Sequence, residues 1–196
     1  MKKIVCLLGS PRPKGNSAVM AQALCEAAEA AGAEVQAFVL NKLTYRGCQG
    51  CLACKKDAEA CVLDDDLTPV LEAVRGCDVL VLATPVYFGE VTAQLKGFID
   101  RTFAYLKGGY QHLPRGERSR LASGKTLVFV IAQGHPREDL FTDIFPRYQY
   151  LLNWQGFTKS HLLRACSVYH QGDAAARPEV LEEARSLGRE LAAAEK

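Results

Sequence analysis

Short apolar runs alternate with stretches of helical spacing along the whole chain. Three runs have no polar alternation, which predicts strands buried on both faces: residues 4–8, 78–83 and 125–132. Two further segments complete a set of five predicted strands: residues 34–40 and 156–165. A helical pattern follows each strand: residues 16–31, 67–74, 92–105, 137–153 with Pro146 forcing a break or kink, and 178–195. This alternation is typical of βαβ units and a parallel sheet.

These elements predict one α/β domain over residues 1–196, built on an open, doubly wound sheet of five parallel strands. A ligand is expected at the carboxyl ends of the first, third and fourth strands. Residues 41–66, after the second strand, lose all periodicity, so we expect an insertion whose order depends on its own cross-links. A basic, glycine-containing segment at 107–124 is expected to be a long loop, and the pattern gives it no role.

The composition excludes several classes of partner. A formal net charge of +2 without a basic stripe gives no sign of nucleic-acid binding. No apolar run approaches the ~18 residues of a membrane helix. The apolar stretch near the N-terminus is too short for an export signal and lacks a small-residue cleavage site. We therefore expect a cytoplasmic protein that binds neither nucleic acid nor a membrane.

The segment GSPRPKGNS, residues 9–17, lies between the first strand and the first helix, where backbone amides and the helix dipole favour an anion. It has neither the Gly-Lys-Ser/Thr ending of a nucleotide-triphosphate loop nor the G-x-G-x-x-G spacing of a dinucleotide site. The side chains that could hold a phosphate monoester, the group in which FMN ends, are Ser10, Arg12, Asn16 and Ser17. The alternative is an ordinary turn in which Asn16 and Ser17 only cap the helix.

Half of the eight cysteines lie between residues 48 and 61, which points to a metal or redox centre rather than to a disulfide framework. The spacing C-x2-C-x2-C-x6-C lets three thiolates converge on a tight loop while a fourth completes a 4Fe-4S cubane: Cys48, Cys51, Cys54 and Cys61. Structural zinc usually takes two separated pairs of ligands. Zinc, free thiols and disulfides formed in air are the alternatives. The other cysteines are expected to be small core residues: Cys6, Cys25, Cys77 and Cys166.

Three motifs together resemble the NADPH-dependent FMN reductase family and its iron–sulfur flavoprotein branch: GSPRPKGNS, TPVYFG at residues 84–89 and LKGFIDR at residues 95–101. The resemblance covers about residues 1–132, and the cysteine motif with the following Asp64-Asp65-Asp66 fits the iron–sulfur branch. It implies a flavodoxin-like fold with a cysteine-rich insertion at 41–66, bound FMN, a 4Fe-4S cluster and a homo-oligomer, either a dimer or a tetramer.

The resemblance also assigns residues to the cofactor. The first loop would bind the FMN phosphate with Ser10, Arg12, Gly15, Asn16 and Ser17. The loop after the third strand would run along the isoalloxazine ring with Thr84, Pro85, Val86, Tyr87, Phe88 and Gly89. Ordinary packing is the alternative for Tyr87 and Phe88. His135, after the fourth strand, could reach the flavin edge. Five aromatic residues are expected in the core or a subunit interface: Phe141, Phe145, Tyr148, Tyr150 and Trp154.

Three functions compete on this sequence. The first is an electron-transfer oxidoreductase in which the cluster exchanges single electrons with FMN, since a flavin can link one-electron and two-electron partners. The second is an NAD(P)H-dependent reductase of free flavin or quinones, in which the cysteines are merely structural. The third is a flavin- or zinc-binding regulatory module. The sequence identifies no catalytic residue, so a redox partner protein and a small-molecule acceptor both stay open, as does NAD(P)H as the donor.

Overall fold

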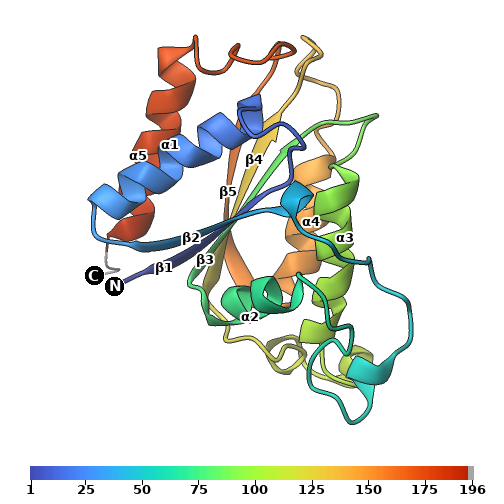
Figure 1. Cartoon of the computed structure of the whole chain (residues 1–196). Helices are drawn as coiled ribbons and strands as arrows, with labels where there is room; N and C mark the ends of the chain where they lie inside the picture. Colours follow the sequence, from blue (N-terminus) through green and yellow to red (C-terminus); the bar gives the residue numbers. More distant parts are fainter. Residues whose placement is uncertain (194–196) are drawn as a thin grey trace.

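The computed structural model describes residues 1–193, which form a five-stranded sheet in the order β2-β1-β3-β4-β5 (Figure 1). The strands are β1 (Lys3–Leu8), β2 (Glu34–Val39), β3 (Val79–Pro85), β4 (Lys125–Ala132) and β5 (Phe157–Ala165). All neighbouring strands run parallel, and the register pairs Leu8 with Val39 on one side and with Ala83 on the other. The predicted doubly wound sheet is confirmed, and the carboxyl ends of its strands share one edge.

Helices cover both faces of the sheet, as Figure 1 shows. One face carries α1 (Asn16–Ala30) and α5 (Pro178–Ala192), and the other carries α2 (Thr68–Gly76), α3 (Ala93–Arg101) and α4 (Ile144–Asn153). Successive residues of β1 enter opposite cores, with Cys6 under α1 and Leu7 under the helices of the other face. Because both faces are covered, each central strand needs an apolar residue at every position, which explains the uniform apolar runs.

Three predicted helix boundaries are wrong. The fourth helix begins at Ile144, because residues 137–143 form turns. Pro146 lies in its first turn, where a backbone N–H would have no partner within the helix, so proline removes no hydrogen bond and causes no kink. The third α-helix ends at Arg101, and the chain then forms a 3-10 turn at Thr102–Tyr105. The cap of α1 is Gly15, without a side-chain hydrogen bond, rather than Asn16 or Ser17. Within residues 1–193, no helix is long and apolar enough to cross a membrane.

The cysteine-bearing insertion is held by contacts with the body of the protein. Tyr45 donates from its hydroxyl to the Gln94 carbonyl at 2.6 Å, which fixes the start of the insertion to α3. At its tip, the Lys55 ammonium donates to the carbonyls of Phe103 and Leu106 and lies 3.8 Å from the centre of the Phe103 ring. These contacts hold the segment in addition to any cross-link of its own, and the expectation that its order depends on such cross-links stays a prediction.

The long loop at 107–124 supports the same contact. It returns antiparallel to residues 105–107, with Lys107 N donating to Arg118 O at 2.9 Å and Arg120 N donating to Tyr105 O at 2.7 Å. Its backbone also comes close to Lys55, since a Cβ on Gly108 would lie 2.4 Å from the Lys55 carbonyl oxygen. This loop therefore packs against the tip of the insertion and helps to hold it.

The packing of α1 against α5 gives a test of the fold. A Cβ on Gly188 would lie 2.2 Å from the Leu24 carbonyl oxygen, so α5 crosses α1 at a distance that only glycine permits. Alanine would favour the helix by ~1 kcal/mol, but overpacking costs more. Gly188→Ala should lower the free energy of unfolding by about 2 kcal/mol in urea titrations. Gly116→Ala, where no atom lies within 4 Å of the new Cβ, is the control and should change it by less than about 0.5 kcal/mol.

Candidate functional site

The loop between β1 and α1 is a tight turn whose geometry suits an anion. Ser10 Oγ accepts from the Arg12 amide and donates to the Arg12 carbonyl, both at 3.1 Å. A Cβ on Gly15 would lie 2.6 Å from Ser10 Oγ, so the turn requires glycine there. No acidic residue occupies the first turn of α1, and no side chain caps it. The positive end of the helix dipole is therefore left without a protein anion.

Two threonines join this turn to the loop that follows β3. Thr92 caps α3, accepting from Leu95 N at 3.3 Å, and its hydroxyl donates to the Gly9 carbonyl at 2.8 Å. The Thr92 amide donates to Thr84 Oγ1 at 3.1 Å, and both threonines are buried. The loops after β1 and β3 are thus fixed relative to one another by buried hydrogen bonds.

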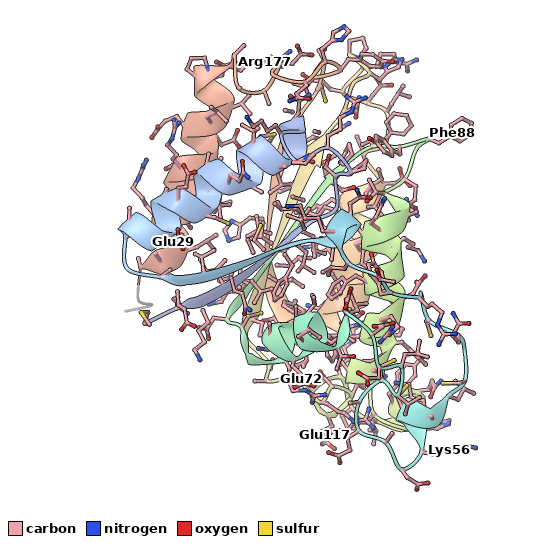
Figure 2. All side chains as sticks on the ribbon, viewed as in Figure 1. Glu29, Lys56, Glu72, Phe88, Glu117 and Arg177 are labelled. Atoms are coloured by element: carbon pink, nitrogen blue, oxygen red, sulfur yellow. The ribbon has the colours of Figure 1, made fainter. Side chains whose placement is uncertain are left out.

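The loop after β3 ends in a two-residue hairpin turn. Tyr87 and Glu90 pair through backbone hydrogen bonds of 2.9 and 3.1 Å, and the two residues between them have positive φ, +51° at Phe88 and +83° at Gly89. This conformation is unfavourable for a phenylalanine. The Phe88 side chain is fully exposed and points away from the body of the protein (Figure 2).

Glu90 fastens this hairpin to α4. Its carboxylate accepts from the Tyr148 hydroxyl and from the Arg147 guanidinium, each at 3.0 Å. Burial would raise the pKa of Glu90, but the Val91 amide and these two donors outweigh it and lower the pKa below its ordinary value. The anchoring carboxylate therefore stays ionised at neutral pH.

The opposite wall comes from the loops after β4 and β5. Gln133, fully buried, donates to the carbonyls of His135 and Arg137 at 2.8 and 2.7 Å. Asn16 holds the loop after β5: its Nδ2 donates to the carbonyls of Val168 and His170, both at 2.9 Å, and its Oδ1 accepts from Ala174 N at 3.1 Å. Side chains thus order both loops.

Together the four loops enclose a cavity of about 800 Å³, within the ~300–1,000 Å³ that small-ligand sites occupy. The predicted site residues that line it are Ser10, Arg12, Gly15, Asn16, Pro85, Val86, Tyr87, Phe88 and Gly89. The remaining lining residues follow β4 and β5: Ala132, Gln133, Gly134, His135, Pro136, Phe141, Val168, Tyr169 and Gln171. The cavity lies at the carboxyl ends of the strands, where the sequence predicts a ligand, and the loop after β5 contributes to it as well.

The four clustered cysteines lie elsewhere, beyond the far end of α3. Figure 2 labels Phe88, at the cavity, and Lys56, in the cysteine loop, on opposite sides of the molecule. All four are free thiols; Cys48 and Cys51 are exposed, and Cys54 and Cys61 are half-buried. Burial raises the pKa of Cys54, Lys55 lowers it, and the other three cysteines raise it further, so the four sulfurs are electrostatic neighbours. Residues 1–193 nevertheless contain no group of three or more His, Cys, Asp or Glu side chains already converged for a metal.

Comparison with known proteins identifies the family. A model of the NADPH-dependent FMN reductase family matches residues 2–140. The chain belongs to this family. An iron-sulfur flavoprotein from Archaeoglobus fulgidus is 40% identical over 138 residues, which cover 69% of this chain and 58% of that protein. Another from Methanosarcina thermophila is 36% identical over 100 residues, 51% of this chain and 52% of that one. The chain thus spans somewhat more than half the length of these relatives.

The fold is confirmed independently as flavodoxin-like. An NAD(P)H:quinone oxidoreductase from Methanothermobacter marburgensis superposes with a TM-score of 0.74 at 23% identity, covering 100% of this chain and 99% of that one. An FMN-dependent NADH-azoreductase from Bacillus anthracis, in complex with FMN, gives 0.69 at 17% identity and 98% coverage of both chains. At these identities the likeness establishes the fold alone. The FMN reductase family member described here is therefore a flavodoxin-like protein of a family of flavin-dependent oxidoreductases.

The first loop of this FMN reductase family member fits a phosphate monoester. The Ser17 hydroxyl is buried in the first turn of α1 and has no hydrogen-bond partner among the described residues, which is costly unless a ligand supplies one. Arg12 is exposed at the cavity, where its guanidinium can pair with an anion. Asn16 departs from its predicted role, because the β5 loop takes the hydrogen bonds of its side-chain amide.

Ser17 and Thr84 do not line the cavity themselves. Ser17 lies behind its surface, and the Thr84 hydroxyl is bonded to the Pro85 carbonyl and the Thr92 amide. The structure therefore gives Thr84 a positioning role in place of the predicted cofactor contact. The cysteines fit an iron–sulfur cluster by the kind and number of their donors, although the loop would have to draw them together.

Sequence reasoning missed the part of the cavity that follows β5. Tyr169 is exposed and lies against Gly134, where a Cβ would come within 2.8 Å of Tyr169 Cδ2. The residues around Tyr169 carry no motif that predicts a binding site, and the family match ends at residue 140. Phe141, expected in the core or an interface, packs partly buried against the core and also lines the cavity. Among the other cysteines, Cys6, Cys25 and Cys77 are buried as predicted, whereas Cys166 is half-buried.

Ser17→Ala should separate ligand binding from stability. The hydroxyl caps nothing in the structure, so its removal should leave the unfolding free energy of the cofactor-free protein unchanged or slightly higher. A hydrogen bond to a charged group is worth ~1.5–3 kcal/mol, so FMN affinity should fall by about tenfold or more. Fluorescence titration of FMN measures the affinity, with the exposed Ser123→Ala as the matched control. Equal affinity for all three proteins would show that FMN does not use this hydroxyl.

Asn16→Ala should loosen one identifiable loop. The substitution leaves Ala174 N–H without its acceptor and frees the carbonyls on either side of Tyr169. Hydrogen exchange at Ala174 should accelerate by about tenfold or more, since a tenfold change corresponds to about 1.4 kcal/mol of protection. Exchange in the β1 and β3 amides should stay as in the parent. Unchanged exchange at Ala174 would mean that Asn16 does not hold the loop.

Proposed function

We propose that this chain is an FMN-dependent electron-transfer oxidoreductase with FMN in the cavity at the carboxyl ends of the strands. The observation that carries the proposal is the turn between β1 and α1 at one end of the cavity: the dipole of α1 is left uncompensated there, and Arg12 is exposed at the cavity. The Ser17 hydroxyl, in the first turn of α1, is buried without a hydrogen-bond partner among the described residues, although it does not line the cavity. When bound, FMN supplies exchange of one or two electrons. The protein supplies the anion-binding turn and the aromatic surface of the cavity.

FMN, rather than a dinucleotide, suits this arrangement. The candidate donors belong to a single turn, in which Gly15 lies close against Ser10 Oγ. A terminal monoester needs only that one cradle, whereas a pyrophosphate needs a second set of donors. Tyr87, Phe141 and Tyr169 supply aromatic surface elsewhere in the cavity for a planar ring.

We further propose that Cys48, Cys51, Cys54 and Cys61 hold a 4Fe-4S cluster, which exchanges single electrons when present. Three observations support this assignment: all four thiols are free, their loop is anchored to the body of the protein through Lys55, and the curated relatives are named iron-sulfur flavoproteins. The partner would be a redox protein or a small-molecule acceptor, in a cytoplasmic homo-oligomer, either a dimer or a tetramer. NAD(P)H is the proposed donor, on the strength of the family.

A second candidate function is an NAD(P)H-dependent FMN or quinone reductase without a cluster. An FMN-dependent NADH:quinone oxidoreductase from Vibrio parahaemolyticus, 30% identical over 115 residues, 55% of each chain, gives this alternative its substrate class. Cofactor analysis distinguishes the two candidates.

Cofactor content after anaerobic purification tests both assignments. The parent should yield FMN on acid extraction, together with about four iron and four sulfide per chain. Cys54→Ser should lose the brown cluster absorbance and keep the yellow FMN band, because the cysteine loop and the cavity lie at opposite ends of α3. Cys166→Ser, outside the motif, is the matched control and should keep both. FAD or no flavin would refute the flavin assignment; FMN without iron in the reconstituted parent would favour the reductase.

A further inference from the structure

Arg101, at the C-terminal end of α3, is a charged residue in the interior of the protein. It is only 1% exposed, and its guanidinium has no access to solvent. Arginine is rarely buried to this degree unless its charge is paired and its donors are bonded. The partners of this side chain therefore indicate what it is there to hold.

All of those partners belong to the cysteine-bearing insertion. Nη1 donates to the Arg46 carbonyl at 2.9 Å and to the Asp65 carboxylate at 2.8 Å, and Nη2 donates to the Leu63 carbonyl at 3.0 Å. Arg46 precedes Cys48 in the chain, while Leu63 and Asp65 follow Cys61. A single guanidinium thus joins the two stems of the insertion, one at Arg46 and one at residues 63–65. All four cysteines lie between these stems in the chain.

Asp65 strengthens the same junction from the other side. Its carboxylate accepts from the amides of Arg46 and Leu67 at 3.2 and 3.1 Å, in addition to the ion pair with Arg101. Burial would raise the pKa of Asp65, but the bonds from Arg101 and these amides lower it. The carboxylate therefore stays ionised beside the guanidinium, and the junction pairs a buried arginine with a half-buried aspartate.

One donor nitrogen of Arg101 has no hydrogen-bond partner among the described residues. This nitrogen is Nε, and it is buried. Cys61 is its neighbour: burial would lower the pKa of Arg101, but Asp65 and Cys61 raise it. Cys61 also lines a small hollow with Ala104 and Tyr105, the residues that follow Arg101 in the chain. A buried donor without a partner therefore lies beside a candidate ligand.

We propose that Arg101 is the charged positioning residue of the cysteine site, which sets the separation of the two stems and gives its Nε–H to the Cys61 sulfur when a cluster is bound. The inference rests on the proposed function for the cluster part of that statement. A positive charge and a hydrogen bond at a ligand sulfur stabilise the more negative, reduced form of an iron–sulfur cluster. Arg101 should therefore raise the reduction potential of the cluster as well as order the metal-free loop.

Three variants test this proposal. Arg101→Gln removes the charge, Arg101→Lys keeps the charge but loses the planar fork that spans the stems, and Arg189→Gln removes an exposed arginine of α5 as the control. Two quantities are measured in FMN-loaded protein: amide hydrogen exchange over residues 44–67 without metal, and the midpoint potential of the reconstituted cluster by dye titration. The retained FMN band verifies that each variant is folded.

Both the amide exchange rates and the cluster potential should change in Arg101→Gln. Exchange at the amides bonded to Asp65 should accelerate by tenfold or more, and the cluster potential should become more negative; Arg101→Lys should show the faster exchange with a smaller shift of potential. Arg189→Gln should match the parent. Parental exchange and parental potential in Arg101→Gln would overturn the inference. If that variant fails to bind FMN, Asp65→Asn provides the same comparison with the arginine in place.

The two proposals fail in different ways. If the parent binds no iron, the proposed cluster fails, while accelerated exchange in Arg101→Gln still supports the positioning of the stems and unchanged exchange refutes it. If the parent binds a full cluster whose potential is the same in Arg101→Gln, the cluster stands and the role of Arg101 in tuning it is refuted.

Discussion

The parallel pairing of the strands is the constraint on which the rest of this structure depends. Because β1, β3, β4 and β5 run in the same direction and in register, the loops that follow them meet at one edge of the sheet and enclose the cavity. The pairing is stable because helices bury both faces of the sheet, so each central strand contributes apolar side chains to two cores. The cavity is thus a consequence of topology before any of its polar residues is considered.

The features that the sequence predicts correctly are those that depend on residues close together in the chain. Uniform apolar runs identify the central strands, and a strand–loop–helix pattern around residues 9–17 identifies the anion-binding turn, since both depend on neighbours in the chain. The predicted start of α4 is wrong because residues 137–143 have helical spacing but form turns, whose carbonyls accept a local bond from Gln133 and long-range bonds from Arg164. Tertiary contacts there override the local pattern.

The residues that the sequence could not assign are those whose partners are far away in the chain. Asn16 was expected to cap a helix or hold a phosphate, yet it bonds Val168, His170 and Ala174. Tyr169 lines the cavity because Asn16 fixes its backbone and Gly134 leaves room for its ring. In the sequence, Arg101 is only the last residue of the LKGFIDR motif, and its partners in the insertion lie 36 to 55 residues away in the chain.

The helix α3 links the two candidate sites through the polar residues at its ends. Thr92, at its start, bonds the Gly9 carbonyl of the anion-binding turn, and Arg101, at its end, bonds both stems of the cysteine loop. A helix of nine residues is about 13 Å long and does not stretch, and this one is buried along Leu95, Phe98 and Ile99. These two buried side chains, together with the bonds of Tyr45 and Lys55, hold the cavity and the cysteine loop at opposite ends of the same helix. The polar contacts of Thr92 lie at the cavity and those of Arg101 lie at the cysteine loop, so separate substitutions address the two sites.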